Sequence, residues 1–168
     1  YGGRVGKLKE IINNSNNIVA FTGAGVSTLS GIKDFRGKNG LYKEKFEHSA
    51  EYYLSSRCFF LESDTFYKFY KSNMNVLDKG PNIVHKYLTK LEKDGKLKAV
   101  VTQNIDGLDK KSGTKNVLEI HGTIYKNYCA KCCKEYSAEY VFNSKGVPYC
   151  DCKGIIKPYV VLYGEMLN

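Results

Sequence analysis

Five of the six cysteines lie close together, and four of these five form two short pairs. Residues 133–149 separate the pairs, which are Cys129-Ala130-Lys131-Cys132 and Cys150-Asp151-Cys152. Two close cysteine pairs at this separation fit a zinc ribbon, in which four thiolates surround the metal as a tetrahedron. Because four protein ligands leave no position for water, the predicted zinc is structural and does not take part in catalysis.

Either Cys132 or Cys133 could be the second zinc ligand of the first pair, and loop geometry decides between them. Cys133 adjoins Cys132 and could compete with it, but the C-x-x-C spacing favours Cys132. A redox role for the pairs is the competing interpretation. Cys58 stands among Phe59, Phe60 and Leu61 and is expected to be a core residue.

A glycine turn follows the first short apolar run. Residues 18–22 read as a buried strand that leads into Gly23-Ala24-Gly25-Val26-Ser27. A strand that delivers Gly-x-Gly into a helix N-terminus is typical of sites for the pyrophosphate of a dinucleotide, because the backbone can approach closely and offers free N–H groups. Thr28 stands where the third glycine of that fingerprint would be. On these residues alone, a tight turn that merely needs small side chains is an equal alternative.

The remaining elements alternate between strand and helix. Apolar spacing predicts an amphipathic helix over residues 4–15, a loop over 32–42 and mostly helix over 47–71. Pro81 and Gly95 mark the two ends of a further helix. Apolar runs predict strands at 97–102 and 117–120. This order predicts a parallel α/β sheet.

Composition limits the classes of protein to consider. The chain has 168 residues, enough for one core, with 42% hydrophobic and 26% charged residues. No run of about 18 apolar residues occurs, so we expect no membrane span. The first residues lack the apolar centre of a signal peptide, so we expect an intracellular protein, cytoplasmic or nuclear. The net charge of +9 is spread over most segments, so nucleic-acid binding is possible but not favoured.

Several motifs occur together in one order. They are Gly23-Ala24-Gly25-Val26-Ser27, Gly31-Ile32-Lys33-Asp34-Phe35-Arg36-Gly37, Pro81-Asn82 with His85, Thr102-Gln103-Asn104-Ile105-Asp106-Gly107-Leu108, Glu119-Ile120-His121-Gly122, the cysteine pairs and Lys157-Pro158-Tyr159-Val160-Val161-Leu162-Tyr163-Gly164-Glu165. In order and spacing they resemble the sirtuins over nearly the whole chain. The resemblance implies a partial Rossmann-like parallel sheet (1–44, 80–124, 155–168), an inserted small helical module (45–79) and a zinc-ribbon module with four cysteine ligands (125–154).

The resemblance also implies an activity. Sirtuins remove acetyl groups from lysine side chains of proteins, consume NAD, and release nicotinamide and O-acetyl-ADP-ribose. The expected cofactors are therefore NAD and zinc, and the expected partners are acetylated proteins or peptides, with no membrane. Two alternatives remain. One is a mono-ADP-ribosyltransferase that uses the same NAD pocket, and the other is a basic zinc-ribbon fragment that binds nucleic acid without catalysis.

The resemblance assigns roles to particular residues. His121 is the expected general base and Asn104 its catalytic companion. A histidine side chain suits this role because its ordinary pKa lies near neutral. Asp106 would accept from the nicotinamide amide, and Phe35 would shield the reacting sugar from water. The expected cofactor-binding residues are Gly23, Ala24, Gly25, Ser27, Ile32, Asp34, Phe35, Arg36, Tyr42, Gln103, Asn104, Ile105 and Asp106.

The substrate would pair with the end of the chain as an added strand. The Val161 carbonyl would receive the N–H of the acetyl-lysine amide, and Tyr163 would line the lysine tunnel. Relatives that prefer acidic acyl groups carry Tyr-x-x-Arg, whereas this chain has Tyr67 and Tyr70, which favours simple acetyl. The expected substrate-binding residues are His121, Val160, Val161, Leu162, Tyr163 and Gly164.

Three features differ from the family pattern. Lys33 stands where many sirtuins have proline, and Asp109 stands where they usually have histidine. The chain ends at Asn168, whereas sirtuins normally continue with more strands and a Gly-Thr-Ser loop over the adenosine. We therefore expect weaker cofactor binding from these 168 residues alone.

Overall fold

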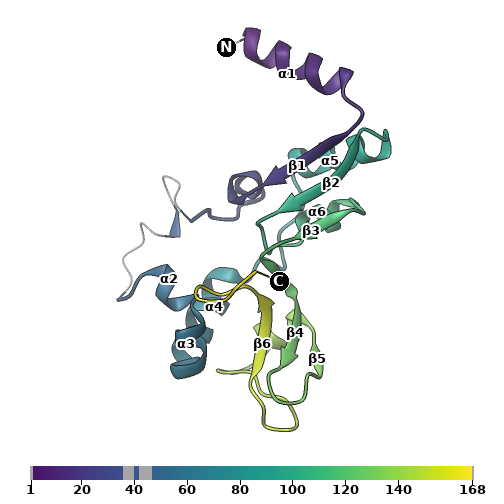
Figure 1. The fold of residues 1–168 in the computed structure, drawn as a ribbon. Helices are drawn as coiled ribbons and strands as arrows, with labels where there is room; N and C mark the ends of the chain where they lie inside the picture. Colours follow the sequence, from purple (N-terminus) through teal and green to yellow (C-terminus); the bar gives the residue numbers. More distant parts are fainter. Residues whose placement is uncertain (1, 36–39, 42–46, 168) are drawn as a thin grey trace.

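A parallel three-stranded sheet carries the glycine turn. The structure is a computed structural model that describes residues 2–35, 40–41 and 47–167. The strands are β1 (Ile18–Thr22), β2 (Leu97–Thr102) and β3 (Val117–Glu119), all parallel and in the order β1-β2-β3. The predicted parallel α/β sheet is therefore confirmed (Figure 1).

Two helices connect the strands of this sheet. Helix α5 (Ile83–Lys93) precedes β2 and packs against it and against α6 (Leu108–Ser112). Sequence reasoning placed the start of α5 at Pro81, but the helix begins at Ile83. The Asn82 side chain accepts a hydrogen bond from the Val84 amide at 2.9 Å, so Asn82 is the N-cap and Pro81 lies outside the helix.

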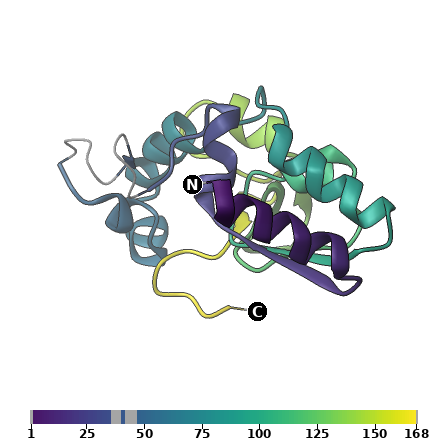
Figure 2. The same cartoon turned by 90° about the horizontal axis from the view of Figure 1, so that it is seen from above.

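A helical module lies at the opposite end of the molecule from α5 and α6 (Figures 1 and 2). It consists of α2 (Ala50–Tyr53), α3 (Ser56–Leu61) and α4 (Ser63–Met74). Serine side chains cap the first two helices, because Ser49 and Ser55 accept hydrogen bonds from backbone amides of the first turn. The expectation of mostly helix in this region is confirmed, with breaks at 54–55 and 62.

A second sheet carries the cysteines and the end of the chain. Its strands β4 (Gly122–Cys129), β5 (Glu135–Tyr136) and β6 (Ile156–Val160) are antiparallel in the order β5-β4-β6, and α7 (Ala138–Asn143) packs on β4. One hydrophobic core joins this sheet to the helical module. In it, Tyr70 stacks between Phe66 and Phe142 at ring-centroid distances of 5.4 Å each. The predicted boundaries of the modules, at 45–79 and 125–154, stay predictions.

The first helix is present, and its Ile12 packs against the core of the first sheet, but most of its apolar side chains do not pack. Helix α1 (Gly2–Asn14) matches the predicted amphipathic helix, yet its apolar residues Val5, Leu8 and Ile11 are exposed, as is Phe21 of β1. Figure 1 shows α1 beyond the end of β1, away from the second sheet. In the part of the chain that the structure describes, no helix is long and apolar enough to cross a membrane.

Candidate functional site

The glycine turn lies directly beyond β1. Gly23 is extended, and a 3-10 helix, η1 (Ala24–Ser30), follows it in place of the expected α-helix. Ala24 and Ser27 face a cavity of about 500 Å³. A Cβ atom added at Gly25 would meet no neighbouring atom within 4 Å, so there is open space where a ligand can approach the backbone.

The end of β2 lies beside the glycine turn because the two strands are parallel neighbours. The Gln103 amide donates to the Thr22 carbonyl at 3.0 Å. The Asn104 side-chain amide donates to the Gly23 carbonyl at 3.0 Å and to Ser27 Oγ at 3.3 Å. Asn104 therefore ties the two predicted halves of the cofactor site together, although they are 81 residues apart in the sequence.

Asp106 is buried and held from two sides. Ser27 Oγ donates to Asp106 Oδ2 at 2.6 Å, and the Leu108 amide donates to Oδ1 at 3.0 Å. Hydrogen bonds of this kind to a charged group are short and strong, so the carboxylate is fixed in one orientation. Each oxygen keeps a further lone pair, with which it can accept from a ligand amide.

His121 stands two residues after β3, half-buried at the edge of the cavity. Its Nδ1 lies 2.9 Å from the backbone carbonyl of Gln103. Because a carbonyl can only accept, Nδ1 carries the proton in this contact, and in the neutral ring the lone pair is then on Nε2. The backbone thus holds the imidazole in the tautomer that a general base needs.

The segment after β6 forms another wall of the cavity. The Val161 amide donates to the His121 carbonyl at 2.9 Å, and the Tyr163 amide donates to the Leu54 carbonyl at 3.0 Å. Strand β6 itself ends at Val160, so residues 161–165 are not in a regular strand. The Val161 contact is with the residue directly before β4, and Tyr163 forms an isolated parallel bridge with Ser55 of the helical module. The expectation that a substrate peptide pairs with residues 160–165 stays a prediction.

Most of the predicted site residues meet in this one cavity. The predicted residues that line it are Ala24, Ser27, Ile32, Phe35, Gln103, Asn104, Ile105, Asp106, His121, Val160, Val161, Leu162, Tyr163 and Gly164. The predicted residues Gly23, Gly25 and Asp34 lie near it in the chain but not in its lining. Arg36 and Tyr42, also predicted, lie outside the described residues.

Part of the lining comes from the helical module and was not among the predicted site residues, although Tyr70 had been singled out for its bearing on acyl preference. Tyr70, Asn73 and Met74 of α4 line the cavity at helical spacing. Tyr70 is fully buried, its hydroxyl has no hydrogen-bond partner among the described residues, and burial raises its pKa. Tyr67 instead donates its hydroxyl to the Ile156 carbonyl. The helical spacing was visible in the sequence, but which face of α4 meets the cavity depends on packing.

A buried carboxyl group lies behind the cavity. Asp109 is 2% exposed, and burial, with a smaller effect from Asp106 and Glu119, raises its pKa to about 6.

His85 is also buried. Its Nδ1 accepts from the Asn82 amide at 3.2 Å and completes the cap of α5.

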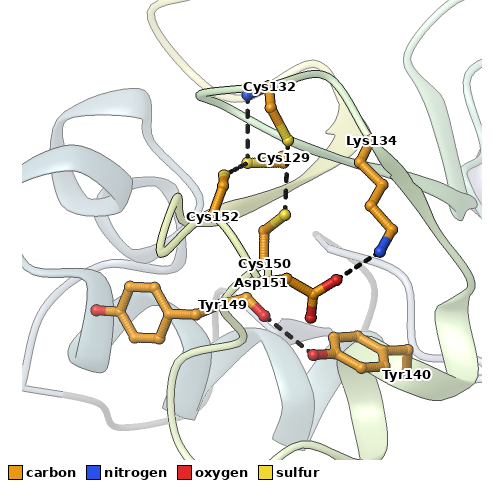
Figure 3. A network of polar contacts seen from close by, with 8 residues as sticks. All are labelled: Cys129, Cys132, Lys134, Tyr140, Tyr149, Cys150, Asp151 and Cys152. Atoms are coloured by element: carbon orange, nitrogen blue, oxygen red, sulfur yellow. Dashed lines mark hydrogen bonds and ion pairs between the residues drawn. The ribbon is translucent and has the colours of Figure 1, made fainter.

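The four predicted cysteine ligands meet at the tip of the second sheet (Figure 3). All four sulfur atoms lie within 4.8 Å of one another, with 3.5 Å between Cys129 and Cys152 and 3.6 Å between Cys132 and Cys150. Sulfur ligands about 2.3 Å from a tetrahedral zinc ion are separated by about 3.8 Å, so the group fits that metal.

Cys133 does not join this group. It is exposed, has a positive φ of 61°, and is not among the four residues whose sulfur atoms lie within 4.8 Å of one another. Two further contacts link the chain after the first cysteine pair to the residues around the second pair. Lys134 forms an ion pair with Asp151 at 2.6 Å, and the Tyr140 hydroxyl donates to the Tyr149 carbonyl at 3.0 Å (Figure 3).

Comparisons with known proteins agree on one family. Residues 23–168 match the Sir2 family. A protein of Clostridium perfringens named NAD-dependent protein deacetylase is 51% identical over 168 residues, which cover 98% of this chain and 69% of that protein. One of Sulfolobus acidocaldarius with the same name is 47% identical and covers 96% of this chain and 65% of that protein. The chain thus spans about two thirds of the length of these relatives.

Solved structures give the same result. A Sir2 variant with a deacetylated p53 peptide and 3'-O-acetyl ADP ribose matches with a TM-score of 0.88 at 39% identity, over 96% of this chain and 66% of the other. The structure of Sir2Tm bound to a propionylated peptide matches with a TM-score of 0.83 at 36% identity, over 96% of this chain and 65% of the other.

Proposed function

Because the chain belongs to the Sir2 family, we propose that it removes acetyl groups from protein lysine side chains while consuming NAD. One observation carries this proposal. The glycine turn, Asp106, His121 and the segment after β6 all border one cavity. The proposed dinucleotide site, base and peptide-binding segment would thereby meet at the same point, which is what a transfer between lysine and NAD requires.

The residues of the first sheet would hold NAD. The open space at Gly25 suits a close approach of the pyrophosphate to the backbone. Asp106 has lone pairs left to accept from the nicotinamide amide, and Asn104 fixes the position of the turn. NAD, when bound, supplies an electrophilic ribose carbon and carries the acetyl group away as O-acetyl-ADP-ribose.

His121 would act as the general base. Its Nδ1 proton is engaged by the Gln103 carbonyl, so the Nε2 lone pair is available to accept a proton from a ribose hydroxyl. Because the contact partner is backbone and not a carboxylate, the imidazole gains orientation without a neighbouring negative charge. Asn104 follows Gln103 directly in the chain and supports the same wall of the site.

The segment after β6 would bind the acetylated peptide. Within the described residues, no hydrogen bond uses the Val161 carbonyl, whereas the Val161 amide is occupied by His121. A free carbonyl beside the base suits the N–H of the acetyl-lysine amide. Backbone recognition of this kind predicts weak preference for the flanking sequence. Tyr70 and Met74 give the far end of the cavity an aromatic and apolar wall, which supports acetyl over acidic acyl groups.

The zinc site would be structural, because four thiolates complete a tetrahedron and leave no open position. It would hold together the loops on either side of β5. No disulfide joins any of the six cysteines, all of which the structure describes, and a site of four thiolates suits a reducing compartment, which supports an intracellular location, cytoplasmic or nuclear.

Release of nicotinamide from NAD tests the proposal. We would incubate this chain with NAD and either an acetyl-lysine peptide or the same peptide without the acetyl group. The proposal predicts release that depends on the acetyl group. Transfer of label from NAD to protein without any acetylated peptide would instead indicate an ADP-ribosyltransferase. Salt-dependent RNA or DNA binding with no nicotinamide release would indicate the nucleic-acid alternative.

A further inference from the structure

We propose that a buried ion pair between Lys157 and Glu165 positions the peptide-binding segment 161–164. Lys157 lies on β6 before this segment, and Glu165 lies directly after it. This inference deepens the proposed function, on which it rests, by naming the side chains that shape the substrate segment. Neither residue needs to touch the reacting atoms, so both are positioning residues.

The pair is held inside the protein. Lys157 Nζ lies 3.1 Å and 3.2 Å from the two carboxylate oxygens of Glu165, and the lysine side chain is only 9% exposed. The ammonium group also donates to the Val160 carbonyl at 3.4 Å and lies 5.9 Å from the centre of the Phe59 ring. Exposed ion pairs contribute little, but one that is buried and hydrogen-bonded on both sides has a fixed geometry.

Glu165 uses this fixed position to close a turn. Its Oε2 accepts from the Leu162 amide at 2.9 Å, and its own amide donates to the Leu162 carbonyl at 2.9 Å. Both backbone groups of Leu162 are therefore bound by one residue. Gly164, between them, has a positive φ of 91°, which allows the chain to turn back.

The turn fixes the backbone group that the substrate would use. Val161 lies between Val160, whose carbonyl is held by Lys157, and Leu162, whose amide is held by Glu165. With both flanking peptide groups restrained, the Val161 carbonyl has a single direction. Without Lys157, Glu165 would be a half-buried carboxylate with no cation to pair with, and it would turn toward solvent and release Leu162.

The test compares Lys157→Met with wild type. Methionine fits the apolar surroundings of the lysine stem and removes only the charge. Lys157→Arg keeps the charge and serves as the rescue variant, and Lys90→Met removes an exposed lysine of a surface ion pair on α5. Hydrogen exchange at the Leu162 amide reports on the turn without substrate. Titration with a fluorescent acetyl-lysine peptide reports affinity and binding stoichiometry, and NAD titration is done in parallel.

We expect Lys157→Met to speed exchange at Leu162 at least tenfold. It should also raise the peptide Kd at least tenfold, with unchanged stoichiometry and an unchanged Kd for NAD. Lys157→Arg should keep an exchange rate at Leu162 and a peptide Kd close to those of wild type, and Lys90→Met should behave as wild type. A purely structural role would instead lower the stoichiometry and leave the Kd of the remaining sites unchanged, which would overturn the proposal.

The remaining outcomes are also decisive. Unchanged exchange at Leu162 would show that the pair does not hold the turn and would overturn the proposal, as would faster exchange with unchanged peptide affinity. A wild-type chain that binds no acetylated peptide overturns the proposed function, and the positioning role with it. Because exchange is measured without peptide, that failure is distinguishable from a failure of the ion pair itself.

Discussion

The backbone carbonyl of His121 accepts a hydrogen bond from the amide of Val161, at 2.9 Å. This contact joins the predicted base to the segment that would hold the peptide. The His121 side chain is at the same time fixed by the Gln103 carbonyl at the edge of the first sheet. One residue therefore links the two sheets at the cavity, and changes on either side should affect its position.

Alanine substitution at Gly122 should lower stability, whereas alanine substitution at Gly25 should weaken cofactor binding. A Cβ at Gly122 would lie 2.0 Å from the Tyr159 carbonyl oxygen, and its φ is +80°, so Gly122→Ala must push β6 away from β4. We expect a loss of about 2–4 kcal/mol in unfolding free energy, measured by urea denaturation. At Gly25 an added Cβ meets open space. Gly25→Ala should keep its stability within about 1 kcal/mol and weaken NAD binding. Equal loss of stability in both variants would contradict this account.

Ser27→Ala should disturb the site by releasing Asp106. The lost hydrogen bond is short and buried and has a carboxylate as acceptor. We expect about 1–3 kcal/mol less stability and at least tenfold slower nicotinamide release. Thr28→Ala is the matched control, because it removes an exposed hydroxyl bond to Gly25 on the same helix and should cost less than about 0.5 kcal/mol. The interpretation fails if both variants release nicotinamide equally fast.

Cys132→Ser and Cys133→Ser should differ sharply. Only Cys132 lies with the other three sulfur atoms, so its loss should abolish stoichiometric zinc and lower Tm by about 10 °C or more. Cys133→Ser should retain one zinc per chain and the wild-type Tm. Metal analysis and thermal unfolding measure the two effects. Zinc loss in the Cys133 variant would show that the ligand set is different.

Asp109 should make stability depend on pH. Its pKa is about 6 in the fold against an ordinary value of 3.8, so the folded state binds the proton more tightly than the unfolded state does. The contribution of this group to stability therefore falls as pH rises from about 4 to about 6, and is constant above that range. An asparagine at position 109 has no proton that titrates in this range. Asp109→Asn should gain about 2 kcal/mol over wild type between about pH 4 and about pH 7, measured by urea unfolding. A difference that does not vary with pH would exclude this assignment.

Local sequence was enough to predict the three strands of the first sheet, but it did not predict β4, β5 or β6 of the second sheet, and the roles of the residues that follow the strands came from the family resemblance. Short β-branched runs such as 18–22 and 97–102 favour strands, although Val19 and Phe21 of β1 are exposed and not buried as expected. The parallel pairing of these strands brings Gly23 and Asn104 to one edge. The spacing of the two cysteine pairs likewise predicted a tetrahedral zinc site. These features depend on contacts within a strand, a turn or a short loop.

Features that depend on packing between distant segments could not be predicted. The sequence does not indicate which face of α4 would bring Asn73 and Met74 to the cavity. The pairing of Lys157 with Glu165 was equally hidden, because a lysine in a strand is usually exposed. The amphipathic pattern predicted helix α1 but does not indicate what covers its apolar face, and Val5 and Leu8 are exposed in the described part of the chain.

Identification of the products from an acetyl-lysine peptide and NAD, by mass spectrometry, tests the central claim most directly. The account predicts equal amounts of deacetylated peptide and O-acetyl-ADP-ribose from the wild-type chain. In His121→Ala, product formation should fall by about 10²–10⁴-fold, the range for loss of a general base, with an unchanged circular dichroism spectrum. Undiminished O-acetyl-ADP-ribose in that variant, or ADP-ribose attached to protein in place of the acetylated sugar, would contradict it.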